Sequence, residues 1–264
     1  MRWVLNYQNL FQDINIYNMK YLKLFESFEE IDSICKKFGI TNYTVNLDGT
    51  VDVDGYVNFG FMKLKKLPIR FGIVTGDFSC DNNELTTLEG SPSRVGGYFI
   101  CNSNELTTLK GGPSEVGGNF WCSNNSLTSL EGSPSEVGGM FWCGSNKLIT
   151  LKGAPKEVGG DFQCQYNKLT NLEGSPSKVG GNFFCYNNEL TSLEGGPKEI
   201  GRAFDCDDNP IYEVYRLFPN YKYFMDSLDY NYLRGKTIDK LRFQQALDEI
   251  GREMPESIPG YKWI

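Results

Sequence analysis

The sequence predicts a repeat solenoid: a parallel β-sheet built from stacked 21-residue coils, with a small helical cap at each end. The first observation is that cysteine recurs every 21 residues, at Cys80, Cys101, Cys122, Cys143, Cys164, Cys185 and Cys206. The second is that other columns keep the same step, starting at Phe78, Asn83, Leu85, Leu88 and Pro92. The third is that the sequences on either side lack the repeat and carry helical patterns instead.

Each unit reads G-x-F-x-C-x-x-N-x-L-T-x-L-E-G-x-P-x-x-V-G. Its phenylalanine and cysteine are two residues apart, so they point to the same face of a strand over F-x-C. The two leucines that follow are expected to be buried. The Gly-Gly pair is expected to make a tight turn with positive φ, and the proline is expected to hold the returning arm. One unit cannot bury its apolar face alone, whereas stacked units can.

The chain divides into three predicted regions. Residues 1–45 form an N-terminal arm and cap helix, residues 46–209 the solenoid, and residues 210–264 a helical C-terminal cap. Within the solenoid, 77–209 holds the regular repeats and 46–76 holds degenerate initial coils. Stepping back one period from the first regular unit reaches only apolar residues, namely Val57, Phe59, Leu64, Leu67 and Val74.

Both flanking regions carry helix signals. Ser27 and Glu30 have capping-box spacing before an apolar stripe that Gly39 ends, and residues 1–20 are expected to add a helix or an arm. Residues 210–218 and 221–233 look helical, and Thr237 is expected to N-cap a further helix that ends at Gly251. The apolar tail 258–264 either docks in this cap or binds a partner. A cap here would protect the open strand edge.

The segment N-x-L-T-x-L resembles the leucine-rich repeat, over roughly residues 57–210. Cysteine and phenylalanine stand where that family has leucines, which implies a flatter β-solenoid than a typical horseshoe. The longer pattern L-T-S-L-E-G-x-P-x-E-V-G-G-x-F-x-C-x-x-N resembles repeat proteins of tailed bacteriophages and their hosts, and residues 19–28 resemble the start of many small phage proteins. This resemblance implies a phage-encoded protein acting in the host cytoplasm.

Composition narrows the function classes. The net charge is −7 and there is no histidine, which argues against a nucleic-acid binder because that would need a basic stripe. The sequence has no run of 18 apolar residues, so no membrane span is predicted. No secretory signal is recognisable. We therefore expect a soluble cytoplasmic protein, without a cofactor and without a membrane partner.

The eight cysteines have a functional and a structural interpretation. One thiol per coil makes a line, whereas zinc requires a tetrahedron, and parallel stacked side chains do not pair well as disulfides. A ladder of buried reduced thiols is favoured, which implies a reducing compartment. Similarly, Asp48, Asp52 and Asp54 miss the EF-hand spacing, so turns around a short strand are favoured over a calcium site.

Columns that vary between coils are free for recognition. The outward positions around Phe and Cys are unusually aromatic, and the predicted partner-binding residues are Tyr98, Ile100, Trp121, Met140, Trp142, Gln163, Phe184 and Tyr186. Exposed apolar patches mark binding sites, and Trp and Tyr are common interface anchors. We expect a protein partner on this face; the alternative is self-cover, by a homodimer or by the N-terminal arm.

A non-catalytic interaction module is therefore the predicted function, with inhibition of a host defence protein as the version that the phage resemblance suggests. A virion or assembly protein is the first alternative. An enzyme is not expected, because a chain without histidine has no Ser–His–Asp triad or H-E-x-x-H site, and neither a catalytic residue nor a metal ligand is predicted. A glycan-binding or glycan-cleaving solenoid is the second alternative, for which Asp161, Asp205, Asp207 and Asp208 would be the acids.

Overall fold

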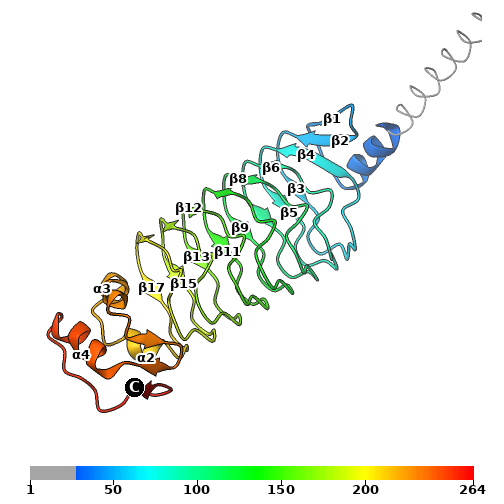
Figure 1. Ribbon diagram of the computed structural model, residues 1–264. Helices are drawn as coiled ribbons and strands as arrows, with labels where there is room; N and C mark the ends of the chain where they lie inside the picture. Colours follow the sequence, from blue (N-terminus) through cyan, green and yellow to red (C-terminus); the bar gives the residue numbers. More distant parts are fainter. Residues whose placement is uncertain (1–27) are drawn as a thin grey trace, which may run out of the picture.

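The computed structural model describes residues 28–264 and shows a solenoid with parallel strands repeating about every 21 residues (Figure 1). Two sheets run along its length. The first, called here the valine sheet, contains β1 (Tyr43–Val45), β2 (Thr50–Val53), β4 (Arg70–Val74), β6 (Arg94–Val95), β8 (Glu115–Val116), β10 (Glu136–Val137), β12 (Glu157–Val158), β14 (Lys178–Val179) and β16 (Glu199–Ile200). The second, the phenylalanine sheet, contains β3 (Val57–Asn58), β5 (Phe78–Ser79), β7 (Phe99–Ile100), β9 (Phe120–Trp121), β11 (Phe141–Trp142), β13 (Phe162–Gln163), β15 (Phe183–Phe184) and β17 (Phe204–Asp205).

Each regular coil thus has two short strands, whereas the sequence predicted one at F-x-C. The strand that was missed ends on the repeated valine just before Gly-Gly; Val137, for example, pairs in register with Val116 and Val158. Its two residues are too few to show an alternating pattern in the sequence. Neighbouring coils pair in parallel throughout both sheets, except that β1 pairs antiparallel with β2 at the start of the valine sheet.

The repeated columns form the core, as predicted. Every phenylalanine from Phe78 to Phe183 is fully buried, as are the paired leucine columns and all seven repeat cysteines. From Phe78 to Phe204, consecutive phenylalanine rings stack with centroids 5.1 to 5.6 Å apart and interplanar angles of 6° to 19°. The degenerate first coil joins this core: Val57 pairs with Phe78, and Phe59 is buried where later coils have cysteine.

The role predicted for the Gly-Gly pairs was wrong. Their φ angles are not positive; within the regular repeats, the glycines with positive φ are those of the column after the second leucine and its charged neighbour, from Gly90 to Gly195. The pairs are needed because adjacent coils approach closely there. A Cβ on Gly138 would lie 2.1 Å from the carbonyl oxygen of Gly117, and one on Gly117 would lie 2.3 Å from that of Gly96. Backbone packing, rather than a special φ, explains this column.

At the N-terminal end, residues 28–37 are helical and Gly39, at φ 67°, ends the helix as predicted. Ser27, the predicted cap, and the predicted arm at 1–20 lie outside the described residues. The three aspartates nearby have structural partners. Asp48 accepts hydrogen bonds from Thr50, Asp52 accepts one from the backbone of Ile73 at 2.7 Å, and Asp54 accepts one from the hydroxyl of Thr75 at 2.9 Å.

The C-terminal cap contains α2 (Tyr212–Tyr215), α3 (Tyr221–Ser227), the 3₁₀ helix η1 (Leu228–Tyr230), β18 (Leu233–Arg234), β19 (Thr237–Ile238), α4 (Lys240–Asp248) and β20 (Lys262–Trp263). Thr237 lies in a strand, so its predicted capping role was wrong; the side chain of Asp239 caps α4 instead. The tail does dock, because β20 pairs with β19.

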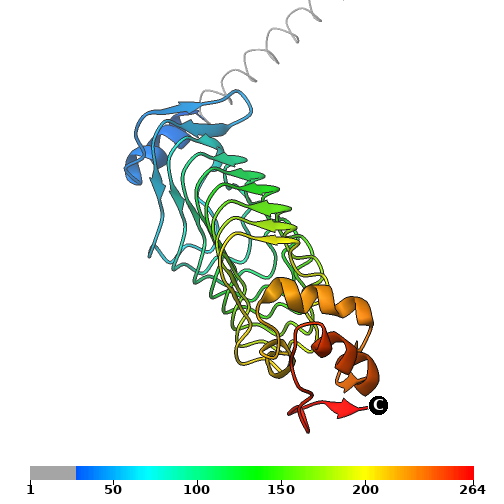
Figure 2. The same cartoon turned by 90° about the vertical axis from the view of Figure 1, so that its left-hand side faces the viewer.

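This cap packs on the last coil, at the end of the solenoid (Figure 2). The ring of Tyr221 lies 4.4 Å from that of Phe204, which ends the phenylalanine stack. The hydroxyl of Tyr261 donates a hydrogen bond of 3.2 Å to the carbonyl oxygen of Thr191. The last apolar ring of the stack is therefore covered by aromatic side chains rather than by a further coil.

Candidate functional site

The outer side of the phenylalanine sheet carries the predicted aromatic residues. Ile100, Trp121 and Trp142 are direct neighbours in β7, β9 and β11. The ring of Tyr98 stacks on Trp121 at 6.1 Å and 28°, and Trp121 meets Trp142 edge to face at 6.2 Å. Tyr98 is 43% exposed, and the other residues, together with Met140, are half-buried. The structure thus brings five predicted residues into one patch, called here the tryptophan patch (Tyr98, Ile100, Trp121, Met140 and Trp142).

A smaller group lies further along the same face. Phe184 and Tyr186 have ring centroids 6.4 Å apart, and Tyr166 meets Tyr186 edge to face at 5.5 Å. Gln163 connects this tyrosine group (Tyr166, Phe184 and Tyr186) to the tryptophan patch, because it pairs in register with Trp142 on one side and Phe184 on the other. All eight predicted residues therefore lie on one continuous face.

Tyr166 belongs to this face and was not predicted. It is 53% exposed and adopts a left-handed conformation, with φ 57°. The same position in the other regular coils holds Asn, Ser or Asp, the short polar residues that tolerate this conformation best. Comparing the repeats would have found it, since it is the one large side chain in a column that the backbone reserves for small polar ones.

The column just before each phenylalanine has a structural role that the sequence did not reveal. The side chains of Asp77, Asn119 and Asp161 each accept a hydrogen bond from the backbone N–H of the same position one coil later, at 2.7 to 2.8 Å. Tyr98 and Met140 occupy this column but have no side-chain oxygen that could accept such a bond. At these two coils, apolar side chains replace inter-coil hydrogen bonds on the face where the tryptophans lie.

The indole rings are fitted to the column after cysteine. A Cβ on Gly144 would lie 2.9 Å from Nε1 of Trp142, so a larger residue there would displace that ring. Nε1 of Trp121 is buried and has no hydrogen-bond partner, and the same holds for Oγ of Ser123 in the next column position. An unpaired buried polar group costs about 1–3 kcal/mol. In the described residues, neither of these two polar atoms has a protein hydrogen-bond partner.

Acidic side chains lie at both ends of this face. Asp77 and Asp81 flank β5 at one end, and Asp205, Asp207 and Asp208 lie in or after β17 at the other. Partial burial and the neighbouring Asp205 and Asp208 raise the pKa of Asp207 above its ordinary value. Asp161 lies two coils before this cluster and is hydrogen-bonded to Asn182, so the four acids considered for glycan cleavage are not assembled in one place.

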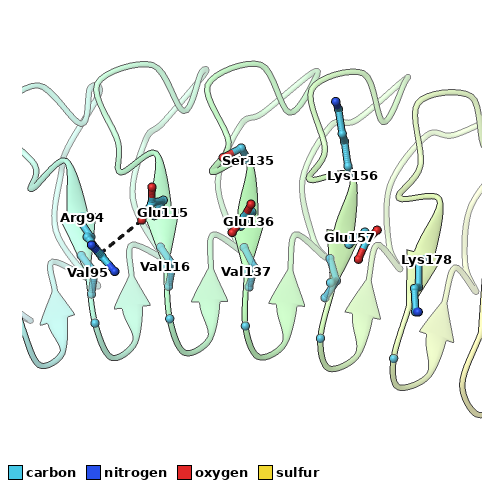
Figure 3. Close-up of a pocket in the computed structure, with 16 residues that line it drawn as sticks. Arg94, Val95, Glu115, Val116, Ser135, Glu136, Val137, Lys156, Glu157 and Lys178 are labelled. Atoms are coloured by element: carbon cyan, nitrogen blue, oxygen red, sulfur yellow. Dashed lines mark ion pairs between the residues drawn. The ribbon is translucent and has the colours of Figure 1, made fainter.

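A groove that the repeat pattern did not predict runs along the valine sheet, on another side of the coils (Figure 3). Its volume is about 980 Å³, and valines and the first glycines of the Gly-Gly pairs line it. Glu115, Glu136 and Glu157 follow one another in register along its wall. Arg94 pairs with Glu115 at 3.3 Å. Within each of these strands the glutamate is exposed and the following valine is buried, as on a sheet with one face in solvent.

The cysteine thiols are buried, and their raised pKa values disfavour the reactive thiolate form. All eight cysteines are buried and free, and burial raises the pKa of each of them, to about 11 for Cys35. Across residues 28–264, no three or more Cys, Asp or Glu side chains are grouped so that they could hold a metal ion. The helices in that same range are all too short or too polar to cross a membrane.

Comparisons of the chain with protein-family models, with curated proteins and with solved structures found no match.

Proposed function

We propose that this protein is a non-catalytic binding scaffold that docks a protein partner on the outer face of the phenylalanine sheet. The observation that carries the proposal is the stack of Tyr98, Trp121 and Trp142, which are contiguous and partly exposed on a sheet whose other side is fully packed. Tryptophan and tyrosine anchors on a rigid support are typical of binding hot spots, and apolar patches of this kind on a protein surface usually mark interaction sites.

Departures from the repeat support this assignment. The repeat favours a hydrogen-bonding side chain where Tyr98 and Met140 stand, and a small polar side chain where Tyr166 stands. Each departure introduces a large apolar group at some loss of local stability, and all of them fall on the same face. A binding role predicts that such departures gather on one surface; Ile149, an exposed residue in a threonine column, is a departure that lies off this face.

The resemblance of the repeat to phage proteins extends the proposal to a source and a target. A phage-encoded scaffold of leucine-rich-repeat type would act in the host cytoplasm, and inhibition of a bacterial defence protein is the activity we propose for it. An assembly or virion role is the competing function, since a regular solenoid also suits a structural part. A glycan ligand is the other competitor, because paired tryptophans stack on sugars as well as on protein side chains.

A capture experiment from bacterial lysate tests the proposal. The wild-type protein is compared with the Trp121→Ala/Trp142→Ala double variant and with Ile149→Ala, whose side chain is 64% exposed but lies outside the aromatic face. We expect a protein that is captured by the wild type and by Ile149→Ala but lost from the double variant. Retention of the same partner by a folded double variant would contradict the proposal. Co-purification with virions instead, or binding on a glycan array, would favour one of the two competitors.

A further inference from the structure

The charge pattern of the aromatic face restricts what can dock there. The three outward columns around Phe and Cys contain several aspartates but no lysine or arginine between Asp77 and Asp207. Apart from Asp161 near the middle, the aspartates of this face lie at its two ends, as Asp77 and Asp81 at one end and as Asp205, Asp207 and Asp208 at the other. Within the described residues, none of these five carboxylates forms an ion pair.

We propose that the occupant of this face is an amphipathic helix of a partner protein, apolar along its middle and basic at both ends. The inference rests on the proposed function, and it names the chemistry of the partner. Lysine or arginine at the helix ends would neutralise the two groups of aspartates, while the apolar stripe would cover the tryptophan patch and the tyrosine group. Such a helix lying on an apolar surface is a recurrent mode of peptide recognition.

The spacing of the coils selects a helix over an extended chain. Parallel strands lie about 4.8 Å apart, so successive residues of the row from Ile100 to Phe184 are separated by this step. A helix laid along the row presents one side of each turn about every 5.4 Å, whereas an extended strand presents alternate side chains only about every 6.8 Å. The helical repeat is the closer match to one contact per coil.

The length of the face sets the length of the helix. Asp77 directly precedes β5 and Asp205 lies in β17. These two strands are six coil steps apart in the phenylalanine sheet. Six steps correspond to about 29 Å, which a helix of about 20 residues spans. Basic residues are therefore expected about five turns apart in the partner sequence, with apolar residues at every third or fourth position between them.

The same charges disfavour a second copy of this chain as the occupant. Both ends of the face are acidic, so either direction of face-to-face pairing would place carboxylates of one copy against carboxylates of the other. Juxtaposed like charges at an interface oppose association. A dimer through this face would bury the tryptophans only by bringing unpaired aspartates together, whereas a basic partner satisfies both parts of the surface.

Synthetic peptides of about 20 residues test the inference by isothermal titration. The first is a helical peptide with a leucine stripe and two lysines at each end. The second carries glutamates in place of those lysines, and the third has all four lysines in the middle of the polar side. We expect the first to bind at least tenfold more tightly than the others at low salt, with most of the difference lost in 0.5 M NaCl because exposed charges are screened.

Variants of the chain locate the effect. Replacing Asp77, Asp81, Asp205 and Asp207 by asparagine keeps side-chain acceptors in place and should abolish the preference for the lysine-ended peptide. The matched control replaces Glu115, Glu136, Glu157 and Glu173 by glutamine, away from the face, and should retain the preference. Denaturation curves show whether each variant is folded.

Equal binding of all three peptides, or failure of all three to bind, would overturn this inference. So would a dimer in sedimentation that Trp121→Ala/Trp142→Ala dissociates. The proposed function is tested separately, because capture of a partner by the wild type and its loss from the tryptophan double variant do not depend on how the peptides bind.

Discussion

The side-chain amide of Asn167 donates a hydrogen bond to the carbonyl oxygen of Cys143 in the preceding coil, at 3.2 Å. The same amide group donates to the carbonyl oxygen of Cys164 in its own coil, at 3.0 Å, and its oxygen accepts from the backbone N–H of Leu148, at 3.0 Å. Asparagine is the residue that can do all three, because its side chain has both donors and an acceptor. The repeat of this residue every coil therefore ties each coil to the one before it.

Replacing Asn167 by alanine should destabilise the protein by about 2–3 kcal/mol, because the buried N–H of Leu148 loses its partner and the three carbonyls that accept from the side-chain amide each lose that bond. Asn167→Asp should cost at least as much, since a carboxylate would face those carbonyls without a donor. Urea unfolding measures both effects. Asn102→Ala is the control, because the side chain of Asn102 lies on the outer face, and it should change stability by less than about 0.5 kcal/mol. A similar effect for Asn102→Ala and Asn167→Ala would contradict the role assigned to the ladder.

Most of the fold follows from the period. Columns such as Phe120 and Cys122 are buried because a residue that recurs in every coil can stack on its own copies. The valine strand and the role of Gly117 did not follow, since a two-residue strand has no pattern of its own and close backbone approach is visible only in three dimensions. In the C-terminal cap, where no repeat constrains the chain, Thr237 was misplaced because strand pairing with β20 outweighed its capping tendency.

The candidate site was predictable to a similar degree. Variable columns showed where Trp121 and Trp142 would lie, because alternation along a strand assigns each residue to a face. The hydrogen-bonding role of Asp77 and Asn119 was not visible, since it joins residues a whole coil apart. In the sequence, Tyr98 and Met140 look like neutral variation. The structure shows that they replace residues whose side chains form hydrogen bonds between coils.

The Gly-Gly column gives a second prediction. Gly138→Ala would place a Cβ 2.1 Å from the backbone oxygen of Gly117, which cannot rotate away. Separation of the two coils would be required, and we expect a loss of about 3 kcal/mol or more. Gly49→Ala is the matched comparison, because Gly49 has φ +78° but no atom within 4 Å of the added group. It should cost about 1 kcal/mol from backbone strain alone. Thermal unfolding of the two variants compares the cost of a backbone clash with the cost of an unfavourable φ angle. Equal losses of stability in both variants would contradict the packing role of Gly138.

The cysteine ladder predicts a steep loss of stability at high pH. Burial raises the pKa of the repeat thiols in the folded protein, whereas in the unfolded chain they ionise near about pH 8.5. Unfolding therefore releases protons above that pH, so the free energy of unfolding is unaffected below it and falls as pH rises through it. Each thiol contributes up to about 1.4 kcal/mol per pH unit, and the seven repeat cysteines act together.

Urea unfolding in the presence of a reductant, between pH 7 and 10, measures this dependence. Cys101→Ala/Cys143→Ala removes two of the titrating groups and should make the decline shallower, by up to about 2.7 kcal/mol per pH unit at the alkaline end of the range. The variant starts from a lower stability at pH 7 because of the cavities, so the slope rather than the absolute value is the readout. A decline that is as steep in the variant as in the wild type would show that other groups control the alkaline transition.

The last prediction separates the needs of folding from those of binding. Asn119 accepts a hydrogen bond from the backbone N–H of Met140 at 2.8 Å, and Tyr98 stands in the same column one coil earlier without such an acceptor. Tyr98→Asn should therefore let the side chain accept from the N–H of Asn119 and stabilise the protein by about 0.5–1.5 kcal/mol. The opposite kind of change in the same column, Asn119→Met, removes the acceptor for the N–H of Met140 and should destabilise the protein by a similar amount. Partner capture should weaken in Tyr98→Asn although the protein has become more stable, because the ring that stacks on Trp121 is gone. A variant that gains stability and keeps full capture would show that Tyr98 has no part in binding, while a loss of stability would show that its ring packing outweighs the missing hydrogen bond.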